Sequence, residues 1–132
     1  MKHVFVDTSG FYALLDPTDP YHQSARNAFE QATSQHWSLH TTSYVVHETW
    51  ALVQHRLGWQ AVEAFLDRLL PLCDVKYVNQ SLHALGAARC RQARQRHLSL
   101  TDCISFEYVA QSGIKTVIAN DEHFQHEGMT LL

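Results

Sequence analysis

The sequence lacks an excess of positive charge. Its 132 residues carry 10 Lys and Arg against 13 Asp and Glu, a formal net charge of −3. This balance excludes a protein that binds nucleic acid by bulk charge alone, because such proteins neutralise many phosphates with basic side chains. A phosphate-bearing substrate would need a local cation, either an arginine cluster or a metal ion. Apolar residues make up 45% and charged residues 17%, which is typical of a folded domain and not of a disordered chain.

Cysteine is scarce, and long apolar runs are missing. The three cysteines are an odd number and form no Cys-x-x-Cys pair, which argues against a disulfide framework and a thiolate zinc site. The apolar run near the N-terminus covers only residues 4–6. A signal peptide needs about 7–15 apolar residues and a membrane span about 20. We therefore expect a soluble, cytoplasmic protein.

Short apolar segments alternate with longer segments of helical periodicity, without repeats or linkers. The length suits one domain over residues 1–132. We expect strands at residues 4–6, 37–41, 75–78, 116–119 and 129–132, and helices at 11–15, 21–31, 44–56, 60–70, 80–94 and 99–113. The prolines at positions 17 and 20 separate the first two helices. Strands separated by helices imply an α/β fold, with a mainly parallel sheet covered on both faces.

Four acidic residues occupy informative places. Asp7 directly follows the first predicted strand, and Asp121 follows the strand at 116–119 after one intervening residue. Active sites of such sheets lie beyond the carboxyl ends of the strands, so both acids share a rim if their strands are neighbours. Asp102 falls in the first turn of a predicted helix, and Glu48 lies in a helix that is apolar nearly all round. A helix of that kind is mostly buried, so its carboxylate needs a partner.

Each acid also has a purely structural explanation. Asp7 can cap the following helix, Asp102 fits a capping box, and Asp121 suits a turn. Glu48 can pair with Arg56 or face solvent. Carboxylates that cluster repel one another unless a cation lies among them, and no Lys or Arg is adjacent in sequence to the three aspartates. Mg²⁺ or Mn²⁺ is the natural occupant of such an oxygen-only site.

The order and spacing of these residues resemble the PIN-domain signature. The matching segments are residues 4–9, 47–50, 99–106 and 120–124. In order, spacing and length the chain is most similar to the small bacterial VapC-type ribonuclease toxins. The resemblance implies a three-layer α/β/α sandwich and an endoribonuclease that depends on Mg²⁺ or Mn²⁺. It also implies a homodimer and inhibition by a small cognate antitoxin protein.

The resemblance also implies roles for individual residues. The metal-binding and catalytic set that it implies consists of four acids, Asp7, Glu48, Asp102 and Asp121. One or two divalent ions held there would activate a water to attack an RNA phosphodiester. Ser9 matches a hydroxyl that the family carries near the first acid. We expect Thr8 and Ser9 to donate hydrogen bonds to a carboxylate or phosphate, and Asn120 to orient a ligand from a second shell.

Basic residues are concentrated immediately before the predicted helix that carries Asp102. Residues 89–97 hold four of the ten Lys and Arg residues. We expect Arg94 and Arg96 to contact RNA phosphates, although arginines also suit the end of a solvated helix. His123 lies two residues after Asp121 and is a candidate substrate contact.

Other functions stay open at this point. An apolar strand followed by Asp7 is reminiscent of a phosphatase nucleophile, but the haloacid-dehalogenase pattern needs a second Asp where Ser9 stands. Ser9 also interrupts the Asp-Thr-Gly of aspartic proteases. A metal-dependent phosphatase, a solitary PIN-like RNA-binding or processing protein without antitoxin, and a binding module with a structural ion are the alternatives. The His36 and His40 pair has helical spacing but no obvious third zinc ligand.

Overall fold

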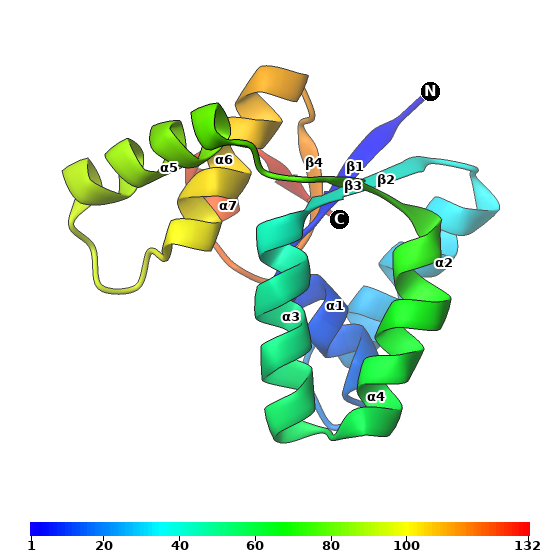
Figure 1. Cartoon of the computed structure of the whole chain (residues 1–132). Coiled ribbons are helices and arrows are strands. Elements are labelled where there is room, and N and C mark those ends of the chain that lie inside the picture. The colour runs from blue at the N-terminus through cyan, green and yellow to red at the C-terminus, as the bar shows by residue number, and fades with distance from the viewer.

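The computed structural model describes residues 1–132 and contains one central sheet with helices on both faces (Figure 1). The strands are β1 (His3–Val6), β2 (Ser38–Thr42), β3 (Cys73–Lys76), β4 (Thr116–Ile118) and β5 (Thr130–Leu131). All neighbouring strands pair in parallel, in the order β3-β2-β1-β4-β5. The predicted α/β fold with a parallel sheet is therefore confirmed.

The central strand β1 is buried on both faces. Val4, Phe5 and Val6 expose no surface. The ring of Phe5 lies 5.9 Å from that of Tyr108 and 6.1 Å from that of Phe124, on the side of the later helices. Because successive side chains alternate across a strand, Val4 and Val6 pack on the opposite side. A continuous apolar run is the expected sequence of a strand covered on both faces.

Two helical layers enclose the sheet (Figure 1). One layer holds α1 (Thr8–Leu15), α2 (His22–Ser34), α3 (Ser43–Arg56) and α4 (Trp59–Ala64), and the other holds α5 (Gln80–Ala93), α6 (Leu100–Ser112) and α7 (His123–His126). In the first layer, the ring of Phe11 lies 6.1 Å from Phe29 and 5.1 Å from Phe65. In the second layer, Phe106 lies 5.1 Å from Phe124. None of the helices has the length and apolar character that crossing a membrane requires.

The region around Pro71 differs from the prediction. The single helix expected over 60–70 is α4 followed by a π-helical segment, η1 (Phe65–Leu69), and a 3-10 turn, η2 (Leu70–Leu72). Pro71 therefore lies inside the turn, near its start, where the missing N–H of proline costs no helical hydrogen bond.

The edge strand β3 begins two residues earlier than expected. In β3, Cys73 and Val75 are half-buried, whereas Asp74 and Lys76 are exposed. This alternation is typical of an edge strand with one solvated face. The expected strand at 75–78 therefore has the right place in the chain but the wrong bounds. The predicted polar turn after β4 contains the short helix α7.

Gly10 brings the first helix against β4. A Cβ atom at this position would lie 2.4 Å from the carbonyl oxygen of Ile118. Only glycine permits this approach, because every other residue would place a side chain atom there. The start of α1 is thereby held beside the end of β4, which brings Asp7 close to the segment that contains Asp121.

Candidate active site

Asp7 lies at the junction between β1 and α1 and is only 3% exposed. Its Oδ2 atom accepts hydrogen bonds from the Ser9 backbone N–H at 3.1 Å and from the Ser9 hydroxyl at 2.8 Å. These bonds cap α1, as the structural explanation predicted. The other oxygen, Oδ1, is buried and has no hydrogen-bond partner. One carboxylate thus caps a helix with one oxygen and keeps the other free.

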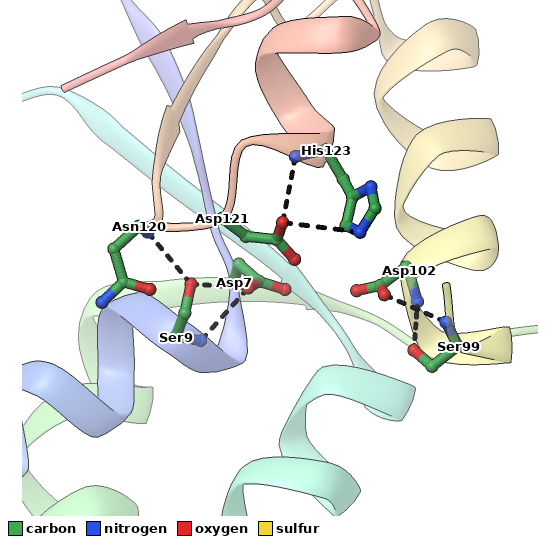
Figure 2. A network of polar contacts seen from close by, with 7 residues as sticks. All are labelled: Asp7, Ser9, Ser99, Asp102, Asn120, Asp121 and His123. Carbon is green, nitrogen blue, oxygen red and sulfur yellow. Dashed lines mark hydrogen bonds and ion pairs between the residues drawn. The ribbon is translucent and has the colours of Figure 1, made fainter. Parts of the chain in front are cut away.

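Asp102 and Asp121 likewise use one oxygen to accept a backbone N–H and leave the other without a hydrogen bond. Asp102 Oδ2 accepts the Ser99 N–H at 3.0 Å, and the Ser99 hydroxyl accepts the Asp102 N–H at 3.0 Å, which forms the predicted capping box. Asp121 Oδ1 accepts the His123 N–H at 2.9 Å. Figure 2 shows the remaining oxygens of Asp7, Asp121 and Asp102 directed toward the space between them. The three segments therefore converge on one point.

These aspartates line one open pocket of about 360 Å³, together with Glu48. Glu48 lies on α3, where only Val45, Thr49 and Val53 are fully buried, so the expectation of a mostly buried helix was wrong. Its carboxylate is half-buried at the edge of that stripe. The alternative pairing of Glu48 with Arg56 was also wrong, because no ion pair joins them. Arg56 lies over the ring of Tyr12, 5.6 Å from its centroid.

The carboxylates of this acidic pocket influence one another. The pKa of Asp7 is raised to about 7, mainly by burial and to a smaller extent by the negative charges of Asp102 and Glu48, while the Ser9 hydrogen bonds oppose the rise. Burial also raises the pKa of Asp102, with smaller contributions from Asp121 and Glu48. No Lys or Arg lines the pocket. Four acids are therefore brought together without a protein cation to balance them.

The acidic pocket offers the donor set that a hard divalent cation prefers. Its ligands are carboxylate oxygens, and Asp7 Oδ1 is a buried acceptor that is costly to leave unpaired. No three of these side chains lie close enough together in this structure to hold one metal ion jointly. Mg²⁺ usually keeps several waters and binds through one or two carboxylates, so an open arrangement is compatible with it. The residues present therefore fit Mg²⁺ or Mn²⁺.

Ser9 joins two segments of the site. Its hydroxyl donates to Asp7 and accepts the Asn120 backbone N–H at 3.1 Å. Asn120 thus contributes its backbone to this network. The Thr8 hydroxyl accepts a hydrogen bond from the Thr49 hydroxyl at 3.1 Å, and no hydrogen bond joins it to a carboxylate. Of the three neighbouring residues named from the sequence, Ser9 is the one that contacts a carboxylate.

The basic stretch before α6 has two different parts. Arg89 pairs with Glu107 at 3.0 Å and with Glu127 at 2.6 Å, so it links α5, α6 and α7. Arg94 and Arg96 are exposed and form no ion pair. They lie in the connection between α5 and α6 that leads to Ser99, a residue of the acidic pocket.

The structure gives the positions of the histidines named from the sequence. His123 Nε2 lies 3.9 Å from Asp121 Oδ1, so the side chain is beside the acidic pocket. His40 pairs with His3 on the neighbouring strand, with 2.8 Å between His40 Nε2 and His3 Nδ1. No helix joins His36 to His40, because His40 lies in β2, and no group of metal ligands forms around them.

Three further residues line the acidic pocket that the sequence did not suggest: Tyr12, Asp19 and Leu52. Asp19 belongs to the segment between α1 and α2, and its Oδ1 accepts the Tyr21 N–H at 2.8 Å. In the sequence this segment is informative only as a helix break. The turn between α1 and α2 places Asp19 beside the site, and no local sequence pattern predicts that position.

Known proteins of the same kind are found by sequence and by structure. The sequence matches the PIN domain over residues 4–127. It is 30% identical over 126 residues to the 23S rRNA-specific endonuclease VapC20 of Mycobacterium tuberculosis, covering 95% of this chain and 94% of that protein. The crystal structure of Mycobacterium tuberculosis VapC20, a sarcin–ricin loop cleaving toxin, matches with a TM-score of 0.87 at 27% identity and covers 98% of both chains.

More distant structures share the fold alone. DNA-bound VapBC from Salmonella typhimurium matches with a TM-score of 0.70 at 15% identity, covering 100% of this chain and 98% of that chain. FitAcB from Neisseria gonorrhoeae matches with a TM-score of 0.69 at 14% identity, covering 98% and 96%. The family that the acidic residues predicted is confirmed: the chain belongs to the PIN-domain family.

Proposed function

We propose that this protein is a divalent-metal-dependent endoribonuclease and the toxin of a toxin–antitoxin pair. The observation that carries the proposal is the convergence of Asp7, Asp102 and Asp121, each with one oxygen free, in a pocket without Lys or Arg. The similarity to a 23S rRNA-specific endonuclease over 95% of the chain supports RNA as the substrate.

The proposed chemistry assigns a role to each acidic residue. When bound, a divalent ion supplies a water of lowered pKa and stabilises negative charge on the phosphate and the leaving oxygen. Asp7, Asp102 and Asp121 would hold the ion with the oxygens that accept no backbone hydrogen bond, directly or through waters of the ion. Glu48 completes the set from α3, directly or through a water. Ser9 holds Asp7 in position by occupying its second oxygen.

The substrate phosphate also needs positive charge outside the acidic pocket. Arg94 and Arg96 carry unpaired guanidinium groups on the connection that leads to Ser99. We assign them to the flanking phosphates of the RNA, where each contact would release counterions. His123 is assigned to a substrate contact beside Asp121.

The related toxin also indicates a first substrate and a partner. VapC20 is described as a toxin that cleaves the sarcin–ricin loop. We therefore choose a synthetic sarcin–ricin loop RNA as the first substrate to test. A toxin in this family implies a cognate antitoxin protein, which would be encoded beside this chain.

The decisive experiment compares substrates and metals. The purified protein is expected to cut the loop RNA with Mg²⁺ or Mn²⁺, to stop when EDTA is added, and to leave a small phosphoester and a peptide intact. Asp102→Asn is expected to fold and to lose cleavage. Equal cleavage with EDTA, or by Asp102→Asn, would contradict the proposal, and hydrolysis of the phosphoester alone would favour a phosphatase.

A further inference from the structure

A second hollow adjoins the acidic pocket and shares a wall with it. Ser9, Asn120 and Asp121 line both spaces. The second hollow measures about 640 Å³, within the size range of ligand-binding sites. It lies at the carboxyl ends of β4 and β5, between the start of α2 and the short helix α7. The metal chemistry proposed above does not use it.

The lining of this hollow suits an uncharged group with one apolar and one polar side. Ala119, Leu131 and Leu132 supply half-buried apolar surface. Hydroxyl and amide groups come from Ser24 and Gln125 among others. No Lys, Arg or His lines the hollow, and Asp121 and Glu122 are acidic. A phosphate would be repelled here, whereas a nucleobase has apolar faces and a hydrogen-bonding edge.

Tyr21 gives the hollow an exposed aromatic ring. Its side chain lines the hollow and is 52% exposed, whereas all six phenylalanines of the chain are buried. Its backbone N–H is held by the Asp19 carboxylate at 2.8 Å, and Asp19 itself lines the acidic pocket. The backbone of Tyr21 is therefore tied to a residue of the acidic pocket. Exposed tyrosines are a common stacking surface for unpaired bases of RNA.

Asn120 has a side-chain amide available for recognition. Its backbone N–H donates to Ser9, and Figure 2 shows its amide turned away from Asp7 and Asp121. Free amide groups can pair with the edges of bases that are splayed out of a helix. Gln125, across from the shared wall on α7, offers a second exposed amide.

We propose that this hollow, the Tyr21 pocket, binds an unpaired nucleobase of the RNA next to the phosphate that is cut. Tyr21 stacks on the base, and Asn120 and Gln125 contact its edge. The proposal rests on the proposed function, because a phosphate in the acidic pocket places the adjoining nucleoside at the shared wall. The Tyr21 pocket would then contribute to the choice of cleavage site.

The test is a double-mutant cycle between Tyr21 and the RNA. The loop RNA is made with its normal base, or with an abasic nucleotide, at each position flanking the cut. With normal RNA, Tyr21→Ala is expected to lower kcat/KM by about 5- to 150-fold, the range given by loss of one stacked base, and Tyr21→Phe to retain most of it. At one abasic position, kcat/KM of the wild-type protein should fall by a similar factor. With that abasic RNA, Tyr21→Ala and wild type should have equal kcat/KM.

The design separates failure of this pocket from failure of the proposed function. Cleavage by the wild-type protein tests the function. Binding of the same RNA with 2-aminopurine at the flanking positions, measured by fluorescence with Ca²⁺ in place of Mg²⁺, tests the pocket without cleavage. Tyr77→Ala, which removes a tyrosine that is 78% exposed and lines neither pocket, is the matched control. Equal kcat/KM and quenching for Tyr21→Ala and wild type, or additive losses at every abasic position, would overturn the proposal.

Discussion

The Ser9 hydroxyl connects Asp7 to the segment after β4: it donates to Asp7 Oδ2 at 2.8 Å and accepts the Asn120 N–H at 3.1 Å. Ser9 and Asn120, which are 111 residues apart in sequence, are thereby joined by one oxygen atom. The hydrogen bond from the Ser9 hydroxyl occupies Oδ2 of Asp7. It thereby leaves Oδ1 as the oxygen that faces the acidic pocket.

Removing this hydroxyl should weaken metal binding more than folding. The Ser9 hydrogen bond lowers the pKa of Asp7, so Ser9→Ala should raise it further above its usual range. We expect a higher Mg²⁺ concentration for half-maximal cleavage at pH 7, and a smaller difference from wild type at pH 9. Ser9→Thr keeps a hydroxyl and serves as the control. An unchanged Mg²⁺ requirement in Ser9→Ala would show that the hydroxyl has no positioning role.

Asp7 should destabilise the metal-free fold at neutral and alkaline pH. Its pKa rises from 3.8 to about 7 on folding. Below pH 3.8 the Asp7 carboxyl is protonated in both states and does not affect the free energy of unfolding. As the pH rises from 3.8 to about 7, the carboxyl ionises more readily in the unfolded chain, so the free energy of unfolding falls. At about 1.4 kcal/mol per pKa unit, the full effect is on the order of 4 kcal/mol, and it is complete above pH 7.

Asp7→Asn cannot ionise, so we expect it to melt at a higher temperature than wild type at pH 8 without metal. The difference should shrink toward pH 4, and Mg²⁺ should raise the melting temperature of wild type alone. Asp74→Asn, which neutralises an exposed carboxylate on β3, is the matched control. If Asp7→Asn melts at a lower temperature than wild type at pH 8, ionised Asp7 does not destabilise the metal-free fold.

Gly10 should matter for the site as well as for the fold. A side chain there meets the backbone oxygen of Ile118 at 2.4 Å, whereas a side chain at Gly86 first meets the flexible end of Ile104 at 2.4 Å. We expect Gly10→Ala to lose about 1–3 kcal/mol of unfolding free energy by overpacking. Because it pushes α1 from β4, cleavage per folded molecule should also fall. Gly86→Ala should lose stability with little change in cleavage per folded molecule. Equal cleavage per folded molecule by Gly10→Ala and Gly86→Ala would count against this role of Gly10.

Much of this arrangement could be predicted from short-range sequence signals. The apolar run of β1, the caps at Thr42, Asn79 and Ser99, and the glycine that ends α6 each act through neighbouring backbone groups, so the sequence displays them. The strand order does not follow from such signals, because pairing of β1 with β4 depends on packing between distant segments.

The parts that the sequence did not reveal share a physical cause. Asp19 reaches the acidic pocket through the turn between α1 and α2, and the pairing of His40 with His3 depends on strand register. The choice between cap and ligand for Asp7 looked exclusive in the sequence. In the structure the cap uses only Oδ2 of Asp7, so Oδ1 stays available as a ligand.

The exposed arginines should make RNA binding depend on salt. Neutralising Arg94 and Arg96 together, as Arg94→Gln and Arg96→Gln, removes two phosphate contacts. The slope of log affinity against log salt should fall by roughly 1–2 for the loop RNA, while the metal requirement stays the same. Fluorescence anisotropy across a salt series measures this slope. Arg26→Gln, which removes a surface arginine paired with Glu30, is the control, and an unchanged slope in the double variant would exclude the assignment.

The acidic pocket is expected to form one divalent-ion site. Titration of Mn²⁺ into the metal-free protein at pH 8, followed by electron paramagnetic resonance of the free ion, measures that site without any assumption about RNA. We predict saturable binding by wild type and by Asp74→Asn, and loss of that binding in Asp7→Asn and Asp102→Asn, with all four proteins folded by circular dichroism. Equal Mn²⁺ binding by wild type and Asp7→Asn would contradict the account.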